Sequence, residues 1–240
     1  MIDTADHYFK DKSLMDSKVL STYGLDKEDI SILKKLKGTE ILPSYTQDVF
    51  LGNSGIVAKV MSLPEQNSLN QYRVIEGRLP EKSGEIALDN VAKLKNNFKI
   101  GDEITFTSEG TTTDLKDSFK ELTYKVTGFV NSPMYIETLT RGTSSIGKGT
   151  ADGFAVIPEN DFSLDYYTEA YLTFQNTKKL QAYSTEYEDT IEKNNKIVEK
   201  ALANQPEKRL AEIKTKGEEK IAEGEKKIAD AKAAISDGEQ

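Results

Sequence analysis

Acidic side chains are the residues of this sequence that could do chemistry, because it contains no cysteine and a single histidine. Asp161, Asp165 and Glu169 are grouped with one phenylalanine and two tyrosines. A catalytic acid and base need such apolar neighbours, which raise the pKa of one carboxyl group and leave the other ionised. The alternative is an exposed turn whose aromatic rings anchor a loop to a sheet, and the sequence favours this second interpretation.

His7 is the only histidine, so any hydrolytic triad would need it as the base. No nucleophile signature lies nearby, and Gly52-Asn-Ser-Gly55 lacks the pattern of a nucleophile elbow. Composition excludes a histidine metal cluster and a thiolate site, and no calcium-loop spacing occurs. We therefore expect a protein that is not an enzyme, with no catalytic residue, no cofactor and no metal site.

The segment 142–149 is close in sequence to the phosphate-binding loop of nucleotide-binding proteins. Gly149 stands where that loop needs a serine or threonine hydroxyl to hold magnesium. Residues 152–156 then have the composition of a strand, whereas the phosphate-binding mechanism needs the N-terminus of a helix. The segment is therefore predicted to be a surface loop that binds no nucleotide.

The charge of the chain argues against a nucleic-acid partner. Its 240 residues carry a formal net charge of -8, most of which lies before Glu207. Phosphate binding needs a basic face, and an acidic surface repels DNA and RNA. No apolar run approaches the ~20 residues that span a bilayer, and no stretch resembles a signal peptide. The absence of oxidisable thiols favours an extracellular location.

Short helices are predicted in the first part of the chain by their capping residues. Asp26 is suited to the N-cap of a helix that ends at Gly38, and Asn90 is expected to cap a second helix through Leu94. Residues 2–16 mix charged and aromatic side chains with no clear period. No element is predicted there.

Strands are predicted around these helices by alternating and β-branched residues. Glu103–Thr107 is expected to pair with Leu122–Val130 in a small β subdomain at about residues 98–150. The turn 52–55 predicts a hairpin between the strands on either side of it. Together these segments predict an α+β fold with a mixed sheet over residues 1–180. The remaining strands are expected at 18–22, 39–49, 56–60, 72–75, 84–88, 153–158 and 169–174.

Residues 181–240 are predicted to form a helical stalk. Ser184 can cap a first helix that runs to about Ala203, and Pro206 is placed to open a second one. In the second helix isoleucine recurs every seven residues, with glycine or alanine three positions later. This heptad pattern predicts a coiled-coil seam. The seam residues are Ile221, Gly224, Ile228, Ala231, Ile235 and Gly238.

The second helix is predicted to need a partner helix. Small residues at a seam let two backbones approach closely, but each glycine costs about 1 kcal/mol against alanine in a lone helix. The heptad is still in phase at Gln240, so we expect a truncated arm whose returning helix, or a partner protein, completes the seam. From Glu207 onward the helix would extend about 50 Å from the body.

Several stretches carry a family resemblance through their order along the chain. Residues 6–25 come first, then Val74-Ile-Glu-Gly-Arg-Leu-Pro80 with Gly84-Glu-Ile-Ala-Leu88, and then Ile100-Gly-Asp102 before a strand. They resemble the extracytoplasmic MacB-like core domain of Gram-positive ABC transporter permeases of the FtsX/MacB family. In that family these turns and strands mark the core, and many members insert a helical hairpin with alanine and glycine heptads.

The resemblance implies a place on the extracellular face of the cell membrane. It implies a transmembrane helix before residue 1, further helices after the returning arm, and an ABC ATPase subunit that acts through them. The α+β core would then couple cytoplasmic ATP hydrolysis to the handling of an extracytoplasmic substrate or partner, with the stalk as a lever or docking arm. A peptide, a lipid or a cell-wall component is the implied partner, and no family catalytic residue is carried over.

Two other functions stay open at this point. A surface structural or adhesion protein with a coiled-coil spacer would show the same heptads, but its gene would encode no set of several membrane spans. A secreted hydrolase that uses carboxylates would need two acidic side chains facing each other in a concave site.

Overall fold

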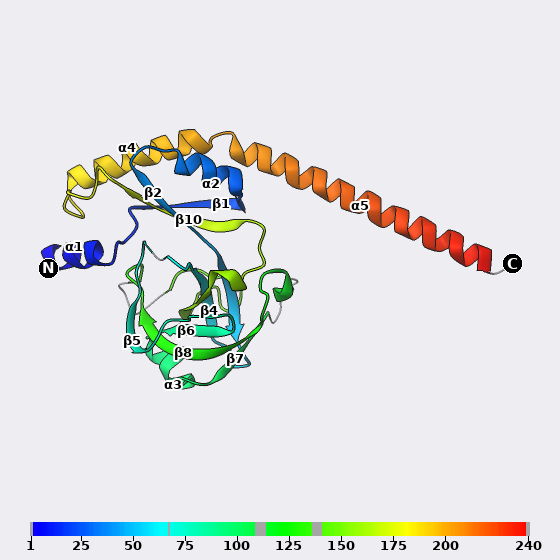
Figure 1. Cartoon of the computed structure of the whole chain (residues 1–240), viewed down its shortest axis with the longest axis horizontal. Coiled ribbons are helices and arrows are strands. Elements are labelled where there is room, and N and C mark those ends of the chain that lie inside the picture. The colour runs from blue at the N-terminus through cyan, green and yellow to red at the C-terminus, as the bar shows by residue number, and fades with distance from the viewer. Residues whose placement is uncertain (1, 67, 109–113, 136–140, 239–240) are drawn as a thin grey trace.

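The computed structural model describes residues 2–66, 68–108, 114–135 and 141–238. These residues form two β-sheets, short helices and a long C-terminal helical arm, so the predicted α+β fold is confirmed. Figure 1 shows a body built of the sheets and short helices, from which one long helix projects.

The smaller sheet is antiparallel and joins the start of the chain to its middle. Its strand order is β1 (Ser17–Leu25), β10 (Tyr167–Phe174) and β2 (Thr39–Ser44). The helices α2 (Lys27–Lys34) and α4 (Thr185–Leu202) cover one face of it (Figure 1). Apolar residues from all of these elements exclude water between the helices and the sheet. The buried ones are Leu25, Ile30, Leu33, Ala170, Leu172, Phe174 and Val198.

Capping fixes where α2 and α4 begin, as predicted. The Asp26 side chain accepts hydrogen bonds from the backbone N–H groups of Glu28 and Asp29, and the Asp29 carboxylate accepts one from the N–H of Asp26. The Ser184 hydroxyl accepts a hydrogen bond from the N–H of Tyr187. These contacts satisfy N–H groups that a helix leaves unpaired in its first turn.

The predicted cap of the third helix is wrong. In α3 (Ala92–Asn97) the N-cap residue is Val91, and no side chain caps the helix. Asn90 is held in the sheet instead, because its N–H donates to the carbonyl of Val130. The sheet contact, which local sequence does not reveal, decides its conformation.

The N-terminal residues form helix α1 (Ile2–Asp11), where the sequence predicted no element. Tertiary contacts stabilise it. The Phe9 ring is buried and lies 6.0 Å from the Tyr183 ring, edge to face. The Asp6 carboxylate accepts hydrogen bonds from Lys10 and from the backbone N–H of Ala182.

The larger sheet closes into a barrel. Its order is β5-β8-β6-β9-β4-β3-β7, and β7 pairs again with β8, so the sheet closes on itself and β5 lies beside the ring. The predicted hairpin and the predicted pairing of β7 with β8 are both present. The strands are β3 (Thr46–Leu51), β4 (Val57–Leu63), β5 (Arg73–Gly77), β6 (Glu85–Asp89), β7 (Glu103–Thr107), β8 (Thr123–Asn131) and β9 (Gly153–Pro158).

Alternation along these strands separates two apolar clusters. Ala155 and Ile157 face the barrel interior, whereas Phe154 and Val156 face outward and pack toward Tyr171 of the smaller sheet. The barrel interior is therefore one core, and the layer between barrel and small sheet is another. The predicted boundaries of a core at residue 180 and of a β subdomain at about 98–150 stay predictions. Two 3-10 turns, Leu115–Asp117 and Glu159–Asp161, complete the body.

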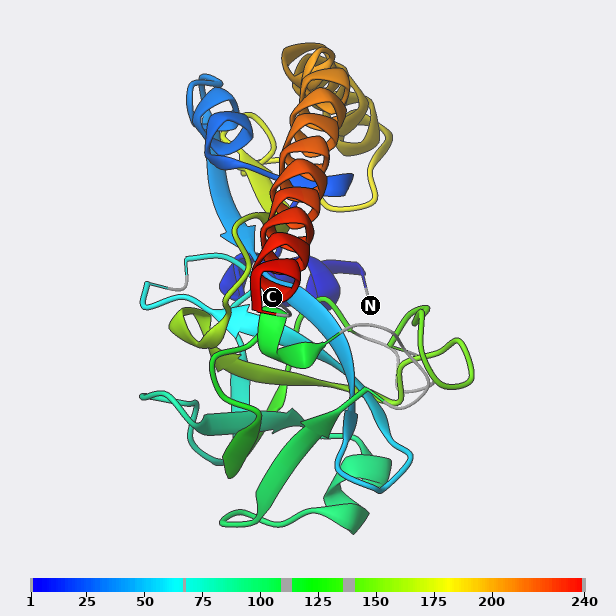
Figure 2. The same cartoon turned by 90° about the vertical axis from the view of Figure 1, so that its right-hand side faces the viewer.

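The helical arm leaves the body after α4. A break at Ala203 and Asn204 precedes α5 (Gln205–Gly238), as the position of Pro206 predicted. The 34 residues of α5 extend about 50 Å. Figure 2 looks along its direction of projection, with the helix-covered small sheet above and the barrel below. Among the described residues, no helix is long and apolar enough to cross a bilayer.

Candidate functional site

The predicted seam lies on α5 with its apolar residues in solvent. Ile221 is 64% exposed and Ile228 is 59% exposed, and Ala231 is exposed as well. A Cβ placed on Gly224 would meet no other atom within 4 Å. Residues seven apart in a helix share one face, so this part of α5 presents an apolar stripe. Ile235 and Gly238 lie outside the residues whose side chains the structure describes.

The exposure of these side chains agrees with the predicted seam but does not show that α5 binds a partner. Beside the stripe, Glu223 and Lys227 form a salt bridge of 2.7 Å. Such an exposed pair contributes at most a few tenths of a kcal/mol (~0.3). The pairing of the seam with a second helix stays a prediction.

The base of α5 is fastened to the body by Arg209. Its guanidinium lies 5.8 Å from the centre of the Tyr166 ring and donates a hydrogen bond to the carbonyl of Tyr23. On the adjoining turn, Lys208 forms a salt bridge with Glu28 of α2. We call Arg209 and Tyr166, with Gly24 beneath the ring, the stalk anchor.

Gly24 makes the stalk anchor possible. Its φ of +75° belongs to the left-handed region that glycine adopts readily, and a Cβ at this position would lie 2.0 Å from the Tyr166 ring. The ring therefore packs on the bare backbone of β1 at Gly24, and Arg209 contacts the same ring. None of the three residues was predicted as a site residue, although Gly24 lies two positions before the helix cap Asp26.

Stacked aromatic rings continue from the stalk anchor into the barrel. Tyr167, the neighbour of Tyr166, lies 4.7 Å from Tyr45, and Tyr45 lies 5.2 Å from Phe162. Phe162 lies 5.1 Å from Phe119 of the barrel core. Packed rings resist independent movement, so the base of the stalk is joined to both the small sheet and the barrel.

The three barrel motifs singled out in the sequence meet at one segment of β8, residues 125–128. The N–H of Arg78 donates to the carbonyl of Thr127, and the N–H of Gly101 donates to the carbonyl of Val126. The N–H of Lys125 donates to the carbonyl of Gly84. The Glu-Gly-Arg turn, the Gly-Glu-Ile strand and the Ile-Gly-Asp turn are therefore one structural unit.

A charged pair locks this unit. The Arg78 guanidinium donates two hydrogen bonds, of 2.7 and 2.6 Å, to the Glu85 carboxylate, which also accepts one from the N–H of Glu81. The hydrogen bond from Arg78 lowers the pKa of Glu85 to about 2. A bidentate pair of this kind fixes the turn to the strand.

The grouped carboxylates do not form a catalytic pair. Asp161 is buried, contrary to the predicted exposed turn, and accepts a hydrogen bond from the N–H of Gly84 in the barrel. Glu169 accepts one from the Tyr171 hydroxyl at 2.7 Å, and Asp165 is exposed. Asp161 and Glu169 therefore have separate hydrogen-bond partners. No three acidic or histidine side chains of the described residues are placed to hold a metal ion.

The other sequence candidates are in ordinary surroundings. His7 is exposed on α1. The segment 142–149 is a loop closed by a bridge between Thr143 and Thr150, and strand β9 follows it. The structure thus has no helix N-terminus behind this loop, as the sequence predicted.

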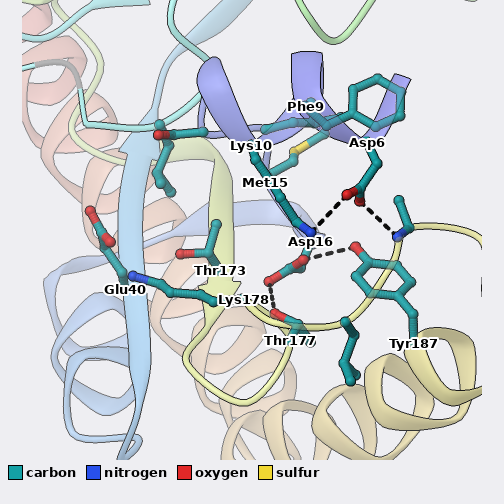
Figure 3. A pocket seen from close by; sticks show the side chains of 15 residues that line it. Asp6, Phe9, Lys10, Met15, Asp16, Glu40, Thr173, Thr177, Lys178 and Tyr187 are labelled. Carbon is teal, nitrogen blue, oxygen red and sulfur yellow. Dashed lines mark hydrogen bonds and ion pairs between the residues drawn. The ribbon is translucent and has the colours of Figure 1, made fainter. Parts of the chain in front are cut away.

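A cavity of about 340 Å³ lies beside α1 (Figure 3). Asp16 lies at its wall and accepts hydrogen bonds from the hydroxyls of Thr177 and Tyr187 and from the N–H of Phe174. These bonds tie the start of β1 to the segment between β10 and α4. The cavity is therefore enclosed by elements that are far apart in sequence.

No protein-family model matches the chain, and no curated protein does. Among solved structures, the chain is similar to the extracellular domain of the noncanonic ABC-type transporter YknZ from Gram-positive bacteria, with 12% sequence identity and a TM-score of 0.38. The match covers 73% of this chain and 86% of that one.

Proposed function

We propose that this chain is an extracellular module of an ABC transporter permease of the FtsX/MacB type. In this proposal the α+β body moves when a cytoplasmic ATPase subunit hydrolyses ATP, and α5 transmits that motion to an extracytoplasmic partner. The partner is a peptide, a lipid or a cell-wall component. The chain itself performs no catalysis.

The observation that carries the proposal is the combination of a fastened base and a free apolar stripe on α5. Arg209 and Lys208 bind the base to β1 and α2, whereas Ile221 and Ile228 remain exposed farther along. A helix held only at one end acts as a lever, because rotation of the body by a small angle displaces its far end by several ångströms. A helix used as a lever must be stiffened by a second one, and the stripe offers the seam for it.

The arrangement of the body also supports the proposal. Three of the four stretches that resemble the permease family converge on residues 125–128 of β8, so this part of the resemblance concerns one packed unit of the barrel. The row of rings from Tyr167 to Phe119 then joins that barrel to the base of α5. Motion of either sheet would reach the stalk through this row.

The proposal is tested with the full-length protein in membranes together with its ATPase. The chain contains no cysteine, so spin labels can be placed at Asn96→Cys in α3 and Glu219→Cys in α5, both exposed. We expect the distance distribution between them to shift between the nucleotide-free state and the vanadate-trapped state. The control pair, Asn96→Cys with Asn53→Cys, lies within the barrel and should not shift.

The same experiment separates the proposal from a static surface spacer. A spacer would show one distance distribution in every nucleotide state, and its gene would encode no further membrane spans. Tyr166→Ala should reduce the shift, because it removes the ring on which Arg209 rests. An unchanged distance in the presence of an active ATPase would contradict the lever mechanism.

A further inference from the structure

The segment that joins α1 to β1, residues 12–16, is bonded to two parts of the body at once. We call it the strap. On the side of the small sheet, the Asp16 carboxylate accepts hydrogen bonds of 2.7 to 2.8 Å from the hydroxyls of Thr177 and Tyr187 and from the N–H of Phe174 (Figure 3). Hydrogen bonds to an ionised carboxylate are the stronger kind. This end of the strap is therefore firmly fixed to β10 and α4.

On the side of the barrel, the strap is held by three hydrogen bonds between uncharged groups. The N–H groups of Asn70 and Gln71, which lie between β4 and β5, donate to the carbonyls of Ser13 and Lys12, both at 2.8 Å. The N–H of Met15 donates to the side-chain oxygen of Asn70 at 2.9 Å. Hydrogen bonds between uncharged groups contribute about half as much as those to a charged group, so the barrel side of the strap is the weaker one.

Backbone strain is concentrated on this weaker side. Ser13 and Asn70 have φ values of 48° and 53°, and Tyr183 (65°) is the one other non-glycine residue with positive φ among the described residues. The left-handed conformation is unfavourable for L-residues, although less so for asparagine than for serine. The carbonyl of Ser13 accepts the hydrogen bond from the N–H of Asn70. The contact that closes the strap is therefore made between two strained residues, and breaking it releases both.

The strap lies far from the points where the chain crosses between the small sheet and the barrel. The two crossings, residues 44–46 and 158–167, reach β10 at its Tyr167 end, where Tyr45 stacks on Tyr167. The strap meets β10 at Phe174, its other end. The barrel is thus connected to the small sheet by the chain itself at one end of β10 and by the strap at the other.

We propose that the strap is a latch that opens on its barrel side and stays closed at Asp16. In the open state the three hydrogen bonds to Asn70 and Gln71 are broken, Ser13 and Asn70 leave the left-handed region, and neither sheet unfolds. The barrel is then free to tilt about the Tyr167 end of β10. Strained residues that the surrounding structure holds in place are typical of such switch segments. The latch is a property of this chain alone and does not rest on the transporter proposal.

Amide hydrogen exchange of the 240-residue chain, followed residue by residue by NMR, tests the proposal. An amide that is exposed by local opening exchanges faster than one that needs global unfolding. After correction for intrinsic rates, we expect the N–H groups of Asn70, Gln71 and Met15 to exchange at least about tenfold faster than two reference amides. These are Val60 in β4, which is paired on both sides, and Phe174, which donates to Asp16.

Two substitutions at one position should move the latch in opposite directions. Ser13→Gly removes the steric cost of positive φ, so the strap amides should exchange about threefold more slowly; the flexibility that glycine adds to the open state offsets part of the gain. Ser13→Val places a β-branched residue at the same φ, so exchange should become about tenfold faster. The matched control is Ser83→Gly in the exposed turn before β6, which should leave the strap amides unchanged.

Three results would overturn the latch. The first is exchange of the strap amides at the rate of Val60, which would mean that the strap opens only when the whole chain unfolds. The second is a change of the same sign in Ser13→Gly and Ser13→Val, which would show that strain at Ser13 does not control the opening. The third is exchange at Phe174 as fast as at Asn70, which would place the opening at Asp16 as well.

Discussion

The barrel buries its apolar side chains within the chain, whereas the stalk leaves its apolar side chains exposed to solvent. In the barrel, β7 pairs with β8 and closes the ring, so the interior side chains have partners within the chain. On α5, Ile221 and Ile228 remain in solvent. The apolar side chains of the barrel are therefore covered within the chain, whereas a covering for those of α5 by a second helix stays a prediction.

Glycine shows the same difference at the level of single atoms. Gly128 in β8 is enclosed by backbone, and a Cβ there would lie 2.5 Å from the carbonyl oxygen of Arg78 and 2.6 Å from that of Glu76. Gly224 in α5 has no atom within 4 Å of the same position. The first glycine is required by the packing of the barrel, whereas nothing in the described structure requires the second.

The largest effect is expected from Gly128→Ala. The added methyl group would press on backbone atoms that cannot move aside, so the free energy of unfolding should fall by about 3 kcal/mol. Urea denaturation followed by circular dichroism measures it. The matched control is Gly224→Ala, which should not destabilise the body. It should raise the helix content of α5, because alanine favours a helix over glycine by about 1 kcal/mol. Equal destabilisation by the two changes would contradict the comparison.

Glu85→Gln should produce the next largest loss in the barrel. Its carboxylate accepts hydrogen bonds from Arg78 and from the N–H of Glu81. We therefore expect the free energy of unfolding to fall by about 2 kcal/mol at neutral pH. Hydrogen bonds to charged groups contribute up to ~3 kcal/mol, and the value here is lower because Arg78 is partly exposed. Urea denaturation of wild type and variant gives the difference.

The pH dependence of this difference follows from the lowered pKa of Glu85. The pKa falls from its ordinary 4.5 to about 2 in the folded protein, so the ionised carboxylate stabilises the fold fully above the ordinary value. That contribution is lost as the pH falls from 4.5 toward 2. The gap between wild type and Glu85→Gln should therefore shrink over this range, and a gap that stays constant would show that the ion pair is not its source.

Arg209→Met tests the joint between the two regions. Loss of the contact with the Tyr166 ring should cost about 1 kcal/mol or less. Its main result should be faster amide hydrogen exchange in the first turns of α5 and a broader distribution of stalk distances. Arg73→Met is the control, because Arg73 forms no salt bridge among the described residues. Equal amide hydrogen exchange in α5 for the two variants would show that Arg209 does not hold the base of the stalk to the body.

The smallest effect on stability is expected from Ile228→Glu. Ile228 is 59% exposed, so the free energy of unfolding should change by less than about 0.5 kcal/mol. In the full-length protein the same change should expose α5 to trypsin, because a charge in the seam prevents pairing. Ala229→Glu, one residue outside the seam, should leave trypsin sensitivity unchanged. Identical digestion of the two variants would argue against a seam at Ile228.

Elements with a strong local signal were predicted correctly. The helix capped by Asp26, the break before α5 and the pairing of β7 with β8 all follow from residues close in sequence. The predictions failed where contacts between segments far apart in the chain determine the local structure. Asn90 is held by the carbonyl of Val130, and α1 is stabilised by contacts with residues near Tyr183.

The candidate sites also divide into one that local sequence reveals and others that distant residues form. The seam was predicted because a repeat of seven residues is visible in one helix, although its pairing stays a prediction. The stalk anchor and the α1 cavity were not found. Arg209 and Tyr166, like Asp16 and Tyr187, are far apart in the chain, and no spacing rule connects them.

Sequence alone determined the α+β class, the capped helices and the heptad stripe of α5, because capping, alternation and helical period act between residues a few positions apart. Tertiary structure decided the closure of the barrel, the anchoring of the stalk on Tyr166 and the cavity beside α1. The physical reason is that these features depend on which distant segments meet. That choice is made by the burial of apolar surface over the whole chain and not by any local preference.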